Sequence, residues 1–228
     1  MFVVLMLGSG LFWTVTYLLI IRQGAHDRTY GMPLAALCAN ISWEFIFSFL
    51  QPPSPIQHGV NLVWLALDSI IFAQLLRYGP REFADLAPTT FYALVGVALA
   101  TAFGAVLLTS DTFHDKGTYA AFGQNLMMSV LFIALLYRRR SLRGQSRGIA
   151  VCKLVGTALA SLAFARYTAI SHHSVLLPFM YVTILAYDAL YVGLVYRQRH
   201  TATRNSNAGS LISRSAEQVT QERVESRT

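Results

Sequence analysis

The chain has 228 residues, of which 54% are apolar and only 13% are charged. A soluble domain carries about 25% charged residues, so the composition excludes an ordinary soluble globule and favours a protein that crosses a membrane several times. The net charge of +7 is spread over separate loops, which favours a role in membrane topology over nucleic-acid binding. Cys38 and Cys152 both lie in apolar runs, which excludes a disulfide-stapled scaffold and a Cys-ligated zinc site.

Seven apolar runs follow one another along the chain, each near the roughly 20 residues that a helix needs to cross the hydrocarbon layer. Segments with proline or glycine separate several of them, as at residues 51–55, 79–80 and 144–146. The sequence therefore predicts an all-α, polytopic membrane protein with seven transmembrane helices. The expected helices cover residues 2–21, 33–50, 60–77, 90–109, 119–137, 149–170 and 175–196.

The loops differ in their basic residues, and the difference predicts the orientation of the chain. The first, third and fifth loops and the start of the tail carry arginines, whereas the second and sixth loops carry no lysine or arginine and the fourth only Lys116. Because basic loops stay in the cytosol, the N-terminus is predicted to lie outside, on the lumenal side, and the C-terminus inside. Residues 1–197 then form the membrane domain. Residues 198–228 are mostly polar and are predicted to form a disordered cytosolic tail.

A charge inside a predicted span costs about 2.5–3.5 kcal/mol on insertion scales, and four of the ionisable residues within the spans are the most informative. They are Glu44, Asp68, Arg166 and Asp188. At about 1.5 Å per residue, the three acids lie about 10, 13 and 20 Å from the outer ends of their helices, and Arg166 lies near an outer end. All four could line one cavity in the outer half of the bundle. The alternative, that Arg166 neutralises Asp68 or Asp188 in a structural ion pair, stays open.

Polar and aromatic neighbours favour a chemical role for two of these acids. Asn40 lies four residues before Glu44, on the same helix face, and could orient its carboxyl group by hydrogen bonding. Asp188 has three tyrosines nearby on its own helix: Tyr181, Tyr187 and Tyr191. Burial disfavours the ionised form of a carboxyl group, which then remains protonated and can donate a proton.

Aromatic side chains could stabilise a cation beside such an acid. Trp43, Trp64 and the tyrosines offer π faces to a developing positive charge. The alternative for each aromatic, a position in the lipid-facing interface belt, stays open.

Other classes of seven-helix protein fit less well. A retinal protein needs a lysine in its last helix, and residues 175–196 contain none. His114, His172 and His173 lack the spacing of a known metal-ligand motif, so no metal site is predicted. A proton-coupled transporter of small molecules remains an alternative, because buried carboxyls also relay protons. A scaffold that uses the Arg-rich fifth loop and the tail to hold partner enzymes or anionic lipid is a further alternative.

Three segments resemble a known family. They are residues 27–33 (Asp-Arg-Thr-Tyr-Gly-Met-Pro), 40–45 (Asn-Ile-Ser-Trp-Glu-Phe) and 186–191 (Ala-Tyr-Asp-Ala-Leu-Tyr). Residues 1–197 are similar to the small integral-membrane terpene cyclases of fungal meroterpenoid and indole-diterpene pathways.

The resemblance implies a reaction and its residues. Such enzymes protonate the terminal epoxide of a farnesyl or geranylgeranyl chain on an aromatic, polyketide or indole head group, and cyclise the chain through cations. The family's two acids fall on Glu44 and Asp188, with Asn40 supporting Glu44. Asp68 and Arg166 are secondary candidates for polar support of the pocket.

The resemblance also sets expectations for cofactors, partners and location. The chain lacks Asp-Asp-x-x-Asp and Asp-x-Asp-Asp, so magnesium-assisted ionisation of a diphosphate is not implied and no cofactor is expected. The expected partners are a lipophilic epoxyprenyl substrate, the bilayer and other enzymes of the pathway, in the endoplasmic reticulum membrane. The head group, the ring number and the immediate proton donor stay open.

Overall fold

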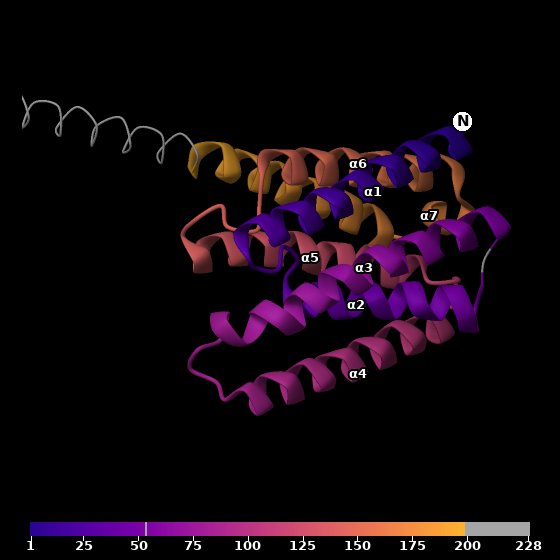
Figure 1. Ribbon diagram of the computed structural model, residues 1–228. Helices are drawn as coiled ribbons and strands as arrows, with labels where there is room; N and C mark the ends of the chain where they lie inside the picture. Colours follow the sequence, from indigo (N-terminus) through magenta and orange to yellow (C-terminus); the bar gives the residue numbers. More distant parts are fainter. Residues whose placement is uncertain (53, 199–228) are drawn as a thin grey trace, which may run out of the picture.

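The computed structural model describes residues 1–52 and 54–198, and its helices lie side by side with roughly parallel axes (Figure 1). The all-α prediction is confirmed. The helices are α1 (Phe2–Asp27), α2 (Leu34–Phe45), a π-helix η1 (Ile46–Leu50), α3 (Pro55–Glu82), α4 (Pro88–Phe113), α5 (Thr118–Arg139), α6 (Arg147–Tyr167), the short α7 (Ala169–His172) and a last helix, Leu176–Gln198.

Six of these helices are long and apolar enough to cross a membrane. The second predicted span is present as a shorter apolar helix, Leu34–Leu50, in which α2 continues directly into η1. The predicted count of seven spans therefore stays a prediction. Of the predicted tail, residues 199–228 lie outside the described residues.

The predicted break at Gly79 and Pro80 is wrong, because α3 continues to Glu82 with Pro80 inside it. Proline has no N–H to donate to the carbonyl oxygen of Leu76, one turn earlier. The hydroxyl of Tyr92 on α4 donates to that oxygen at 3.4 Å. Contact with the neighbouring helix thus replaces the hydrogen bond that proline removes.

Consecutive long helices alternate in direction, so their loops gather at two ends of the bundle (Figure 1). The N-terminus lies at one end, here called the N-terminal end, together with Gln51, Pro52 and Ser54, the loop 114–117 and the segment 168–175 that contains α7. The loops 28–33, 83–87 and 140–146 lie at the other end, here called the basic end. Within the bundle, α1 packs chiefly along α6, and α4 packs chiefly against α2 at its edge.

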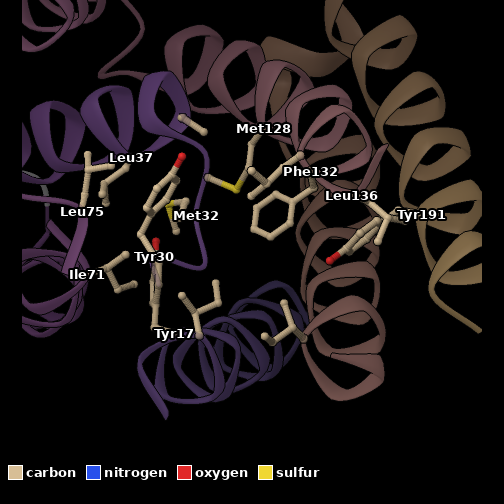
Figure 2. Close-up of a cluster of buried hydrophobic side chains, with 14 of the residues drawn as sticks. Tyr17, Tyr30, Met32, Leu37, Ile71, Leu75, Met128, Phe132, Leu136 and Tyr191 are labelled. Carbon is tan, nitrogen blue, oxygen red and sulfur yellow. The ribbon is translucent and has the colours of Figure 1, made fainter. Parts of the chain in front are cut away.

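Large apolar and aromatic side chains fill the space between the helices (Figure 2). Tyr30 and Met32, from the loop before α2, are buried there with Phe132 of α5 and Tyr191 of the last helix. Close packing of this kind holds helices together in a bilayer, where lipid is as apolar as the side chains.

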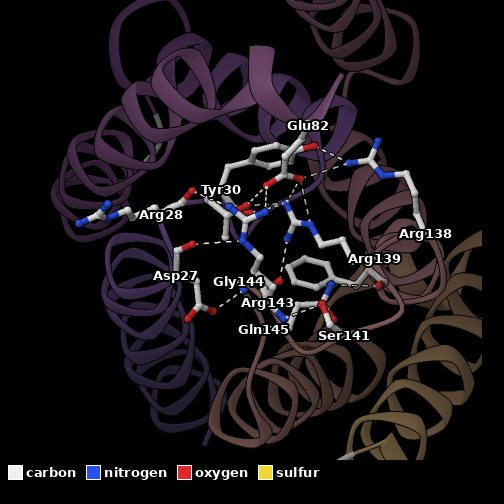
Figure 3. Close-up of polar contacts among 12 residues, drawn as sticks. Asp27, Arg28, Tyr30, Glu82, Arg138, Arg139, Ser141, Arg143, Gly144 and Gln145 are labelled. Atoms are coloured by element: carbon white, nitrogen blue, oxygen red, sulfur yellow. Dashed lines mark hydrogen bonds and ion pairs between the residues drawn. The ribbon is translucent and has the colours of Figure 1, made fainter. Parts of the chain in front are cut away.

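An arginine cluster, consisting of Arg138, Arg139 and Arg143 around Glu82, joins three parts of the chain at the basic end (Figure 3). Arg139 donates to Glu82 from Nε at 3.1 Å and Nη2 at 2.8 Å, and from Nη2 to the carbonyl oxygen of Tyr30 at 2.9 Å. Arg143 donates to the carbonyl oxygens at the end of α1. The end of α5 and the loop that follows it therefore fix the ends of α1 and α3, beyond the topological role that these arginines were predicted to have.

The loop from Thr29 to Met32 owes its shape to this cluster. Thr29 donates to Glu82, and Arg138 donates to the Tyr30 hydroxyl at 2.5 Å. Burial raises the pKa of the Tyr30 phenol. Gly31 leaves no room for a Cβ atom, which would lie 2.7 Å from Ile20 Cγ2. The first segment that carries the family resemblance is thus a tightly packed structural loop.

We expect Arg139→Lys to destabilise the fold, because Arg139 donates from three nitrogens to Glu82, to Thr29 and to the carbonyl oxygens of Tyr30 and Arg143, whereas a lysine has a single nitrogen that cannot reach all of these acceptors. The lost charge-assisted hydrogen bonds are worth about 2–3 kcal/mol, and thermal unfolding in mild detergent would show a clearly lower Tm. Arg140→Lys is the matched control, because Arg140 is exposed. Equal melting temperatures for both variants and the parent would contradict the role given to Arg139.

Candidate active site

A cavity of about 220 Å³ lies between the helices in the half of the bundle nearer the N-terminal end. Its lining comes from α1, α2, η1, α3, α5, α6 and the loop before α5. The lining residues are Met6, Ser9, Trp13, Tyr17, Asn40, Trp43, Glu44, Phe47, Gln57, Trp64, Lys116, Thr118, Ala121, Phe122, Gln124, Asn125, Met128, Ala160 and Phe164. Helical spacing explains the α1 contribution, since residues three or four apart share one face.

Aromatic rings form much of this lining. Tyr17 packs against Trp13 and Trp64, with ring centroids 6.0 Å apart in both pairs. Two indole N–H groups bond to protein atoms: Trp43 donates to the Gly117 carbonyl at 3.0 Å, and Trp64 donates to the Thr14 hydroxyl at 3.0 Å. Trp43 and Trp64 thus lie where the sequence predicted pocket residues. Their ring faces are suited to stabilise a cation.

Among the described residues, Glu44 is the one carboxylic acid on the lining. Its side chain is buried, with 1% of the residue exposed. The Tyr17 hydroxyl donates to Glu44 Oε1 at 3.2 Å, while Glu44 Oε2 has no hydroxyl, amide or ammonium partner among the described residues. Glu44 therefore presents a carboxyl group, without a cation beside it, to an aromatic cavity.

Asp68 lies next to Glu44 but is not part of the lining. The two carboxyl groups are within hydrogen-bonding reach of each other. Asp68 is fully buried. Its polar contact with a neighbouring helix comes from Asn40, whose Nδ2 donates to Asp68 Oδ2 at 2.9 Å.

Asn40 joins four helices. Its Nδ2 donates to Asp68 on α3 and to the Tyr17 hydroxyl on α1, and its Oδ1 accepts from Gln124 Nε2 on α5 at 3.2 Å. The sequence predicted that Asn40 would bond to Glu44 itself. The structure instead places Tyr17 and Asp68 between them, so Asn40 acts on Glu44 through its neighbours.

Asp188 lies apart from the cavity lining and forms a buried ion pair with Lys153 of α6. Asp188 Oδ1 lies 2.6 Å from Lys153 Nζ, and both side chains are 1% exposed. The expectation that Glu44, Asp68, Arg166 and Asp188 line one cavity is therefore wrong, since only Glu44 does. Arg166 is exposed near the end of α6, so Lys153 takes the part of ion-pair partner proposed for Arg166.

Lys153 connects Asp188 to the cavity. Its Nζ also donates to Ser129 Oγ at 2.7 Å and to Asn125 Oδ1 at 3.4 Å, so these three contacts match the three protons of an ammonium group. Asn125, on the cavity lining, donates in turn to Thr157 at 3.2 Å. Asp188 can therefore influence the cavity through Lys153 and Asn125.

The three tyrosines predicted near Asp188 do not line the cavity. The Tyr181 hydroxyl bonds to Ser171, and its ring packs against Phe122. Tyr191 donates to Gln145, and Tyr187 is exposed. The last helix faces the cavity less directly than α1, α2 and α5 do, which its own sequence pattern does not reveal.

Sequence reasoning missed Tyr17 as a site residue and did not identify the ion-pair role of Lys153. Tyr17 lies in a run of apolar residues where a tyrosine is unremarkable. Lys153, in contrast, is a lysine inside a predicted span, which is itself a signal of a buried partner. Among residues 1–52 and 54–198, no three His, Cys, Asp or Glu side chains form a group that could hold a metal ion.

Comparison with known proteins identifies the family. The family of Pyr4-like transmembrane terpene cyclases matches residues 1–205. The chain belongs to this family. It is therefore a membrane terpene cyclase of fungal secondary metabolism, which favours the enzyme interpretation over a transporter or a scaffold.

Individual relatives match about two thirds of their own length. The chain is 34% identical over 165 residues to the Pyr4-family terpene cyclase mfmH of Annulohypoxylon moriforme, covering 70% of this chain and 68% of that one. It is 30% identical to the terpene cyclase macJ of Penicillium terrestre (68% and 63%) and 27% identical to the terpene cyclase pyr4 of Aspergillus fumigatus (69% and 67%). No solved structure matches the chain.

We expect Asp188→Asn to impair folding of the cyclase, because it leaves the Lys153 ammonium buried without its carboxylate. Breaking a buried pair in this way costs about 3–5 kcal/mol. The fraction of monodisperse protein after size-exclusion chromatography in mild detergent should fall strongly, and the double variant Lys153→Met/Asp188→Leu should recover much of it. Asp111→Asn, which changes an acid at an exposed position of α4, is the control. A single variant as stable as the parent would refute this role of the ion pair.

Proposed function

We propose that this cyclase protonates the terminal epoxide of a farnesyl or geranylgeranyl chain attached to an aromatic, polyketide or indole head group. Glu44 is the proton donor. The observation that carries the proposal is the Glu44 carboxyl group, which is buried, contacts no cation among the described residues and lies on an aromatic cavity. A buried carboxyl without a counter-ion keeps its proton, and a neutral acid is what epoxide opening requires.

The proposed reaction moves one proton in and one proton out. Glu44 gives its proton to the epoxide oxygen as the bond from that oxygen to the more substituted carbon breaks. The alkenes of the chain then attack the cation in turn, and loss of a proton from the last carbocation ends the cascade. The acid supplies the proton directly, so the proposed step needs no cofactor.

The lining suits this chemistry in two ways. The rings of Trp13, Tyr17 and Trp64 can stabilise the cations that form along the prenyl chain of the substrate. Apolar residues such as Phe122, Met128 and Phe164 exclude water, which would otherwise trap the cations as alcohols. Gln57, Lys116 and Thr118 supply polar groups nearer the N-terminal end, where a head group would be accommodated.

Asp188 has a supporting role in this proposal. It holds Lys153, and Lys153 holds the side-chain oxygen of Asn125, which lines the cavity. The ion pair thereby fixes part of the lining and keeps a buried positive charge compensated. In this proposal Asp188 supports the reaction without touching the substrate.

The proposed setting is the endoplasmic reticulum membrane, with seven spans, the N-terminus on the lumenal side and residues 198–228 as a cytosolic tail. The three predicted loops that carry arginines all fall at the basic end of the bundle, and this common position supports the orientation. The substrate would enter from the bilayer, and other pathway enzymes would associate at the cytosolic face.

We expect Glu44→Gln to lower the rate of cyclisation by about a hundredfold to ten-thousandfold, the usual contribution of a general acid. Membranes that carry the parent or the variant would receive a panel of epoxyfarnesyl and epoxygeranylgeranyl conjugates, and products would be separated by mass spectrometry. Asp111→Asn serves as the control for loss of an acid outside the cavity. A Glu44→Gln variant that cyclises every accepted substrate at the parent rate would rule out Glu44 as the donor.

A further inference from the structure

We propose that Asp68 is a positioning residue that carries a proton of its own and donates a hydrogen bond to the Glu44 carboxylate formed when the epoxide is protonated. The inference rests on the proposed function of Glu44. It concerns a residue behind the cavity lining, and it explains how a buried carboxyl group can act as an effective acid.

The hydrogen bonds around the two acids leave one oxygen free on each. Tyr17 donates to Glu44 Oε1, and Asn40 donates to Asp68 Oδ2. Glu44 Oε2 and Asp68 Oδ1 have no such donor among the described residues. A protonated carboxyl group has one carbonyl oxygen, which accepts, and one hydroxyl, which donates. The observed pattern matches two neutral carboxyl groups whose carbonyl oxygens are occupied and whose hydroxyls remain available.

The contact between the two acids requires a proton. Two ionised carboxylates at hydrogen-bonding distance can only repel each other, and an isolated buried charge costs several kcal/mol. No salt bridge reaches Glu44 or Asp68 in the described part of the chain, and the buried ammonium of Lys153 is engaged by Asp188. The neutral pair is therefore the resting state that the surroundings favour.

Proton transfer changes what Glu44 needs from its neighbours. Once the Glu44 proton has passed to the epoxide oxygen, a negative charge develops on the Glu44 carboxylate. The hydroxyls of Tyr17 and Asp68 then donate to it from fixed positions, as hydrogen-bond donors do in an oxyanion hole. Asp68 keeps its own proton throughout, and the proton that the last carbocation releases balances the one that Glu44 gave.

Asn40 holds the Asp68 carboxyl in the orientation that this role needs. Its Nδ2 occupies Asp68 Oδ2, which leaves Oδ1 as the oxygen that bears the proton. Gln124 in turn holds Asn40 through Oδ1 at 3.2 Å. Three helices therefore fix the direction in which Asp68 donates, before any substrate binds.

Two substitutions of similar size test the proposal. Asp68→Asn keeps an acceptor for Asn40 and replaces the proposed O–H donor with an N–H donor, whereas Asp68→Leu removes both. We expect the Asn variant to retain kcat within about tenfold of the parent. The Leu variant should lose kcat by about a hundredfold or more, the effect of removing one oxyanion donor, with KM little changed. Ser69→Ala, on the adjacent exposed position of α3, is the control.

Either of two results would overturn the proposal: an Asn variant as inactive as the Leu variant, which would mean that Asp68 acts ionised, or a Leu variant as active as the parent. Glu44→Gln in the same series separates the two hypotheses. An active Glu44→Gln variant removes the proposed function. An inactive one beside an active Asp68→Leu variant removes only the role of Asp68.

An infrared measurement keeps the test decisive if Asp68→Leu does not fold. Protonated carboxyl groups have a separate carbonyl band that shifts in heavy water. The spectrum of the purified cyclase in detergent or lipid should lose part of that band in Asp68→Asn, and also in Glu44→Gln. An unchanged band in Asp68→Asn would show that Asp68 is ionised in the parent, and would refute the proposal.

Discussion

Polar side chains inside the hydrocarbon layer must find their partners within the protein, and this requirement organises the candidate active site. Asn40 meets it by bonding to α1, α3 and α5 from its position on α2. Because one amide bonds to all three, the relative positions of Tyr17, Asp68 and Gln124 depend on each other. Glu44 is one turn from Asn40, so the same bonds determine where its carboxyl group lies. The site is therefore built by helix packing around a single polar junction.

The two acids of the family resemblance lie in opposite electrostatic environments. Within residues 1–52 and 54–198, the polar neighbours of the Glu44 carboxyl are a hydroxyl and another carboxyl group, which favours a neutral acid that can lose a proton. Asp188 lies 2.6 Å from an ammonium group, which favours a carboxylate. Similar residue types in similar apolar runs thus receive different functions from their partners. The distinction follows from Lys153, whose ammonium group bonds to Asp188 on the last helix.

Sequence reasoning predicted the features that depend on composition and local pattern. The helices, the membrane class and Glu44 follow from apolar run length and from the motif at residues 40–45, and Trp43 and Trp64 were predicted as aromatic neighbours of the acids. Which side of each helix faces the cavity does not follow, because helices that are apolar all round give no preferred face. For that reason Tyr181, Tyr187 and Tyr191 were placed in the pocket and Tyr17 was not. The break expected at Pro80 failed for a related reason, since a hydroxyl on the adjacent helix compensates the lost hydrogen bond.

The two ends of the bundle divide stability from chemistry. At the basic end, charged side chains bond to one another and to backbone carbonyls, and Gly31 allows the loop before α2 to pack closely. At the other end the cavity keeps its acid without a counter-ion, an arrangement that by itself costs stability. Because α1, α3 and α5 take part in both, the bonds at the basic end hold the helices that carry Tyr17, Asp68 and Gln124. A rigid end far from the reaction can therefore maintain the short contacts that a destabilised acid pair requires.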